Sequence, residues 1–172
     1  MQKLSRNDHI DLYRHLSFCA VGGFFGCYAV LIHSGVMGNA QTVNLIELLL
    51  DALRGRYTLA AASNGPYEQQ LHRLALAGMK DCFAYFFISQ RIGASKPSPV
   101  FFDAAFREVN EGRGTPVSPA DAAIIGDSLT SDMAGGRGYG LKTVYYRRPG
   151  AAPADGSVDV TVEDLRDIPA LL

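Results

Sequence analysis

Apolar runs of strand length alternate with amphipathic helical patterns from about residue 41 to the end of the chain. The apolar runs predict strands at residues 57–62, 83–88, 122–125, 142–146 and 158–162. One helical pattern precedes the first strand, with apolar residues three and four positions apart at Leu45, Ile46, Leu49, Leu50 and Leu53. Further helices are predicted around Leu71 and Leu74 and at residues 98–109, 130–137 and 163–172. Such alternation is typical of βα units, so we expect an α/β fold: a three-layer, Rossmann-like parallel sheet over residues 41–172.

Residues 1–40 do not share this pattern and are predicted to form a divergent N-terminal segment. Residues 16–32 form a seventeen-residue run without charge. The run is short for a membrane span and contains three glycines, and the nearby Asp8 and Asp11 dilute the positive charge that a signal peptide needs. We therefore interpret it as a buried strand or helix and expect no membrane span.

Composition excludes several function classes. A chain of 172 residues is long enough for one domain with one core. The formal net charge of -1 gives no basic surface for nucleic acid. Its three cysteines form no C-x-x-C pair, which supports neither a disulfide framework nor a zinc site, so we expect a cytoplasmic protein.

Two loops that follow predicted strands carry polar groups suited to an anion. Ligands of a parallel α/β sheet bind beyond the carboxyl ends of the strands. Ser63 and Asn64 follow the strand at 57–62, where a hydroxyl can cap the next helix or share a phosphate oxygen with free backbone N–H groups. Lys96 precedes Pro97, which we expect to start a helix and to hold Lys96 extended at its mouth. Taken alone, Ser63 is explained as well by a helix cap, and Lys96 by a solvated surface lysine.

A third loop carries two carboxylates. The apolar strand at 122–125 runs into Gly126 and Asp127, and Asp132 follows five residues later at the start of a helix. Paired carboxylates supply the hard oxygen ligands that Mg²⁺ prefers. The alternative is that Asp127 caps the helix and Asp132 interacts with its dipole. Capping does not explain the glycine before Asp127, which we expect to leave room for a ligand.

The order of these groups resembles the haloacid dehalogenase (HAD) superfamily of hydrolases. A hydroxyl, a lysine before proline and an acid pair stand on three successive strand-to-helix loops, and the resemblance extends from about residue 44 to the C-terminus. The segments KPSPVFFDAA and GDSLTSDMAGG are similar to the pyrimidine 5'-nucleotidase branch. The resemblance implies an HAD-like core, substrate binding by Ser63, Asn64 and Lys96, a catalytic role for Lys96, and a Mg²⁺ site at Asp127 and Asp132.

The resemblance also implies an aspartate nucleophile in a D-x-D motif after the central strand, and no such motif precedes the first of these loops. Asp8 and Asp11 are three positions apart and do not follow an apolar strand. Two explanations stay open. The chain begins within the cap that the family inserts after its first strand, or residues 27–32 fill the central strand position and His33 and Ser34 stand where the D-x-D motif belongs.

Three classes of function follow, with a cap that is absent or vestigial in each. As an enzyme, the protein would be a Mg²⁺-dependent phosphomonoesterase acting on a small phosphorylated metabolite such as a nucleoside 5'-monophosphate, with doubtful turnover because the nucleophile is missing. As a binding module, it would hold Mg²⁺ and phosphate without turnover. As a structural remnant, it would need a second copy or another partner to complete its sheet. A dehalogenase-type hydrolase is a further alternative, although that branch needs no metal and the acid pair argues for Mg²⁺ and phosphate.

Overall fold

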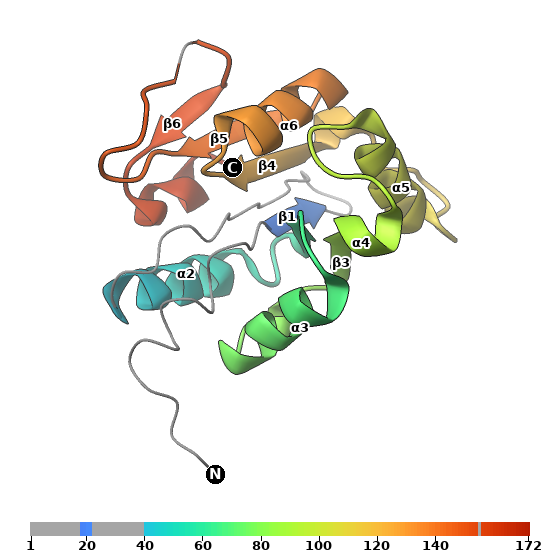
Figure 1. The fold of residues 1–172 in the computed structure, drawn as a ribbon, viewed down its shortest axis with the longest axis horizontal. Coiled ribbons are helices and arrows are strands. Elements are labelled where there is room, and N and C mark those ends of the chain that lie inside the picture. The colour runs from blue at the N-terminus through green and yellow to red at the C-terminus, as the bar shows by residue number, and fades with distance from the viewer. Residues whose placement is uncertain (1–17, 22–39, 155) are drawn as a thin grey trace.

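A single mixed sheet organises the chain in the computed structural model, which describes residues 18–21, 40–154 and 156–172. The strand order is β3-β2-β1-β4-β5-β6 (Figure 1). Neighbours β2–β3, β4–β5 and β5–β6 pair in parallel, which confirms the predicted α/β class. The strands are β1 (Phe18–Val21), β2 (Thr58–Ser63), β3 (Tyr85–Ile88), β4 (Ala122–Gly126), β5 (Lys142–Tyr146) and β6 (Val160–Val162).

The central strand differs from the prediction of a wholly parallel sheet. β1 lies between β2 and β4 and runs antiparallel to both. Its first residue, Phe18, pairs with Ala61 and Ile125 near the carboxyl ends of its neighbours, while Val21 pairs at their amino ends. The start of β1, and not the residue that follows it, therefore lies toward the edge where ligands of a parallel sheet bind. Residues 27–32, His33 and Ser34, which one of the two open explanations placed at this position, lie outside the described residues.

Helices cover both faces of the sheet, as predicted for a three-layer fold. Figure 1 shows α2 and α3 on one side and α5 and α6 on the other. Crossover helices pack on a sheet through one apolar face, and the buried residues of α2 are Ile46, Leu49, Leu50 and Leu53, which follow the predicted spacing. The helices are α2 (Ala40–Leu53), α3 (Tyr67–Leu76), α4 (Ser89–Ile92), α5 (Pro99–Asn110) and α6 (Ala134–Tyr139).

Several predicted boundaries were wrong for local reasons. The final helix is a 3-10 segment over Leu165–Ala170, and Pro169 inside it has no backbone N–H to donate to a longer helix. The last strand is shortened to β6. Asp159, which was predicted within it, uses its side-chain carboxylate to accept from the backbone N–H and the hydroxyl of Thr143. α5 begins at Pro99 with Ser98 at its N-cap, so Pro97 lies before the helix, joined to Lys96 by a cis peptide bond.

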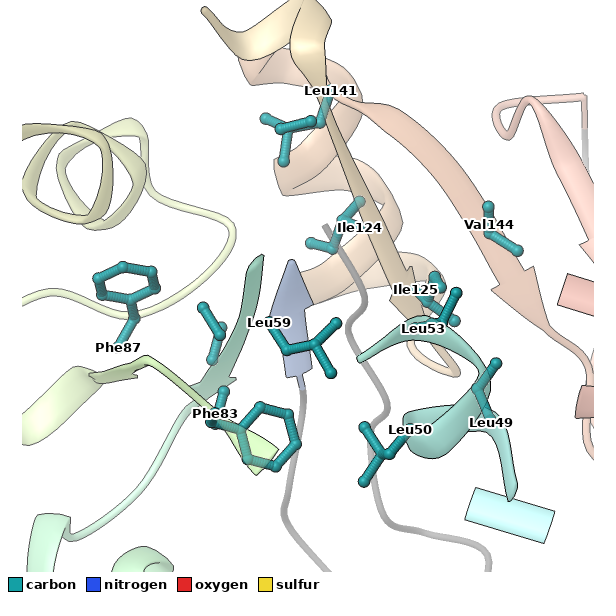
Figure 2. Packing of buried hydrophobic residues seen from close by; sticks show 14 of the residues in the cluster. Leu49, Leu50, Leu53, Leu59, Phe83, Phe87, Ile124, Ile125, Leu141 and Val144 are labelled. Atoms are coloured by element: carbon teal, nitrogen blue, oxygen red, sulfur yellow. The ribbon is translucent and has the colours of Figure 1, made fainter. Parts of the chain in front are cut away.

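One continuous apolar core joins the sheet to its helices. Figure 2 shows part of it, with side chains from α2, β2, β4 and β5 packed together and Phe83 and Phe87 at one side. β2 and β4 are buried along almost their whole length, as expected for strands covered on both faces. In the part of the chain that the structure describes, no helix has the length and apolar character needed to cross a membrane.

Candidate functional site

Lys96 is held from two sides at the carboxyl edge of the sheet. Its ammonium nitrogen donates to the carbonyl oxygen of Ala62 at 2.8 Å and to Oδ1 of Asp132 at 2.7 Å. The side chains of Lys96 and Asp132 are 1% and 0% exposed. The alternative of a solvated surface lysine is therefore excluded, and these two contacts join the end of β2, the segment after α4 and the loop after β4.

Asn64 fixes the backbone of Lys96. Its amide nitrogen donates to the Lys96 carbonyl oxygen at 2.9 Å, and its amide oxygen accepts from the Lys96 N–H at 2.9 Å. Asn64 was predicted as a substrate-binding residue, and the structure shows both ends of its amide on the main chain of Lys96. The turn after Asn64 is also held, because the Gly65 N–H donates to Oγ of Ser89 at 2.9 Å.

Ser63 ends β2 as a fully buried residue beside these groups. Helix α3 has Pro66 at its N-cap and no side-chain cap, so Ser63 is not the cap of this helix. Ser63 directly follows Ala62, whose carbonyl receives the Lys96 ammonium group. The structure therefore brings Ser63, Asn64 and Lys96 together at the carboxyl end of β2.

Gly126 serves a different purpose from the one predicted. A Cβ atom at Gly126 would lie 2.4 Å from Oδ2 of Asp132 and 2.6 Å from its Cγ, far inside van der Waals contact. The space beside this glycine is thus filled by the Asp132 carboxylate and not left for a ligand. The same Oδ2 accepts from the Ser128 N–H at 3.3 Å. Asp132 is therefore fixed through both oxygens, one on Lys96 and one on the loop itself.

Asp127 follows β4 directly and is also buried, with a side chain 1% exposed. It does not cap the next helical turn, because Oγ of Ser128 accepts from the Ser131 N–H in that role. Nε of Arg148 lies 2.6 Å from Oδ2 of Asp127. Loss of solvent raises the pKa of Asp127 to about 7, although Arg148 opposes the shift and Asp132 adds to it.

Arg148 is the site residue that the sequence analysis missed. It lies two residues beyond β5, and β5 pairs in parallel with β4, so the two strands end side by side. The signal was present, since Arg148 stands at the carboxyl end of a predicted strand as Ser63 and Asp127 do. Its neighbours Arg147, Pro149 and Gly150 are typical of a loop, and no site residue was predicted there.

The described residues fit a cation at Asp127. Among residues 18–21, 40–154 and 156–172, no group of three or more histidine, cysteine or carboxylate side chains is placed to hold a metal ion together. Asp127 nevertheless offers the hard oxygen ligand that Mg²⁺ prefers, and the guanidinium of Arg148 stands in for a cation on it. Asp132, the second predicted metal ligand, is engaged by Lys96 and Ser128.

A separate hollow of about 1180 Å³ lies beside α4 and α5 and is lined by residues such as Arg91, Phe106 and Glu108. Its lining includes no residue of the site at the carboxyl edge. The polar groups on the loops, and not the volume of this hollow, therefore mark the candidate site.

The comparisons with known proteins point to one family. A family model described as HAD-hydrolase-like matches residues 93–168, a range that contains Lys96, Asp127, Asp132 and Arg148. Pyrimidine 5'-nucleotidase PynA of Streptococcus pneumoniae is 36% identical over 62% of this chain and 43% of its own length. The phosphoserine phosphatase of Thermus thermophilus is 34% identical over 70% of this chain and 46% of its own length.

A solved structure has the same fold. The putative HAD-hydrolase YfnB of Bacillus subtilis, bound to magnesium, superposes with a TM-score of 0.66 and 26% identity, over 75% of this chain and 55% of that one. The chain spans about half the length of the curated relatives it matches. The order of the site residues, the sheet that carries them and these likenesses place the chain in the haloacid dehalogenase superfamily of hydrolases.

Proposed function

We propose that the chain carries the phosphate-binding edge of an HAD-type phosphomonoester hydrolase. The observation that supports this most directly is the Lys96 ammonium group, bonded to both Ala62 and Asp132 where three strand-to-loop junctions meet. A buried lysine at this edge supplies fixed positive charge for a phosphoryl group in a dry environment. Ser63 would hold a phosphate oxygen, and Asn64 and Asp132 would position Lys96.

Asp127 would hold Mg²⁺ in this proposal. When bound there, the metal would neutralise charge on the phosphoryl oxygens. Asp127 supports the role because its carboxylate is buried and already interacts with a cation. The magnesium-bound relative of the same fold and the loop G-D-S-L-T-S-D favour this assignment over a dehalogenase, whose substrate carries no phosphoryl charge.

We propose a small phosphorylated metabolite as the ligand, with nucleoside 5'-monophosphates as the first class to test. The names of two relatives support phosphomonoester chemistry, one a pyrimidine 5'-nucleotidase and the other a phosphoserine phosphatase. We expect turnover by this chain to be weak or absent. No D-x-D motif precedes Ser63, and the described β1 has its first residue, not its last, toward the site edge. Loss of a nucleophile lowers turnover by several powers of ten while binding groups persist.

A phosphatase assay on nucleoside monophosphates with added Mg²⁺ tests the proposal. The expected result is binding of the monophosphate with little or no release of inorganic phosphate. Robust turnover that Asp127→Asn abolishes and that His33→Ala and Ser34→Ala leave unchanged would overturn the expected inactivity. Abolition by His33→Ala would instead identify a substitute nucleophile. Absence of monophosphate binding would contradict the proposed site itself.

A further inference from the structure

Two acids and two cations balance one another at the carboxyl edge of the sheet. Lys96 pairs with Asp132, and Arg148 pairs with Asp127. Each acid already has a cation at 2.7 Å or less. A divalent cation that binds alone would therefore add positive charge that these four side chains do not compensate. A metal and a phosphate that arrive together would not create this excess.

The two ion pairs differ in how easily they can open. The Lys96 side chain is 1% exposed and cannot leave Asp132 without opening the core. The Arg148 side chain is 36% exposed and lies in the loop after β5, although its Nε, which faces Asp127, is buried. A long side chain of this kind can move its charged end into water while its stem stays packed.

We propose that Arg148 is a built-in competitor for Mg²⁺: its guanidinium occupies the cation position at Asp127, and the metal binds there only by displacing it. This inference rests on the proposed role of Asp127 as the metal ligand. Arg148 released in this way would remain beside the site as a planar donor suited to phosphate oxygens. Metal binding by the wild-type chain is then weak until a phosphorylated ligand is present.

Thermal unfolding in a MgCl₂ titration without phosphate tests the competition, with NaCl of equal ionic strength as the salt control. A ligand that binds only the folded state raises the unfolding temperature once its concentration exceeds its Kd, and the rise grows with the logarithm of that ratio. Arg148→Gln is expected to respond at a Mg²⁺ concentration about tenfold or more below that of the wild type, since an opposing charge has been removed. The double variant Arg148→Gln with Asp127→Asn is expected to lose the response.

Arg147→Gln is the matched control. Arg147 is the preceding residue and equally exposed at 36%, but it pairs with Glu163 and not with Asp127. It should respond to Mg²⁺ as the wild type does. Arg148→Lys keeps a cation near Asp127 and is expected to stay close to the wild type, which provides a second comparison if Arg148→Gln folds poorly.

The outcomes separate this inference from the proposed function. Equal, Asp127-dependent Mg²⁺ responses in the wild type and in Arg148→Gln would overturn the competition and leave the metal role of Asp127 standing. No Asp127-dependent response in any variant, with Arg148→Gln folded, would overturn both. A large gain in Arg148→Gln that Asp127→Asn abolishes would support both.

Discussion

Nζ of Lys96 lies 2.7 Å from Oδ1 of Asp132, and the two side chains are almost wholly excluded from solvent. Through Lys96 the pair also reaches the carbonyl oxygen of Ala62 near the end of β2. Removal of one partner from a buried pair leaves a desolvated charge without compensation. The first prediction follows from this relationship.

Asp132→Asn should destabilise the fold by about 3–5 kcal/mol, because Lys96 would remain buried and charged. Urea unfolding followed by circular dichroism measures the change. Glu108→Gln is the control, since Arg91 and Glu108 are also 2.7 Å apart but are 40% and 38% exposed. An exposed pair of this kind contributes about 1 kcal/mol or less. Equal losses in the two variants would contradict the account of the buried pair.

Gly126→Ala should displace the Asp132 carboxylate, because the new Cβ would lie 2.4 Å from Oδ2. We expect a loss of about 1–3 kcal/mol from overpacking, measured by urea unfolding, together with weaker phosphate binding. Gly138→Ala in α6 is the control, since its Cβ would meet nothing within 4 Å. That substitution should be neutral or stabilising by up to about 1 kcal/mol. A stable Gly126→Ala variant with unchanged binding would show that Asp132 does not need its observed position.

Asn64→Ala should weaken phosphate binding, because it removes both hydrogen bonds that fix the Lys96 backbone. Loss of such bonds also destabilises the fold, by about 1–3 kcal/mol. Asn110 offers a matched control: its amide makes the same two-sided contact with the main chain of Val117, away from the site. Asn110→Ala should lose similar stability and keep phosphate affinity. Calorimetric titration with inorganic phosphate distinguishes the two, and equal affinities would contradict the positioning role of Asn64.

Asp127 should make the stability of the fold fall as pH rises from about 4 to 7. Burial raises its pKa from 3.8 to about 7, so the folded state binds a proton that the unfolded state has already released in this range. The stability contributed by the protonated form is complete below the unfolded pKa and is lost as pH rises through the folded one. Each unit of pKa shift corresponds to about 1.4 kcal/mol.

Urea unfolding at several pH values, for the wild type and for Asp127→Asn, measures this effect. The difference in unfolding free energy between the two proteins should grow in favour of Asp127→Asn as pH rises from 4 to 7, and stay constant above that. A difference that is the same at every pH would show that Asp127 titrates near its ordinary value.

Much of the fold could be predicted from residue patterns, because periodicity reports directly on burial. Ile46, Leu49, Leu50 and Leu53 of α2 recur at helical spacing and are buried, and the apolar run of β2 is buried as expected for a covered strand. The direction of β1 could not be predicted, because a four-residue apolar strand reads the same in a parallel or an antiparallel pairing. The end of the chain was predicted as a helix over residues 163–172, whereas the structure has a 3-10 segment over Leu165–Ala170 that contains Pro169.

The sequence predicted which residues lie at the site better than it predicted which of them pair with one another. The positions of Ser63, Lys96, Asp127 and Asp132 at strand ends follow from the topology of a parallel sheet. Which acid pairs with which cation depends on side-chain packing across loops that are distant in sequence. Lys96 and Asp132 are 36 residues apart, and the partner of Asp127 is an arginine from a loop that drew no prediction.

Titration of a nucleoside monophosphate into a variant that lacks both buried charges of the site tests the central claim most directly. The double variant Lys96→Met with Asp132→Asn removes both buried charges together, so it avoids the unpaired charge that either single change leaves. The account predicts that the wild type binds a nucleoside monophosphate in calorimetric titration, and that the folded double variant binds it at least about tenfold more weakly, since a charged hydrogen-bond donor is lost. Equal affinity in the wild type and in a folded double variant would contradict the assignment of this edge as the phosphate site.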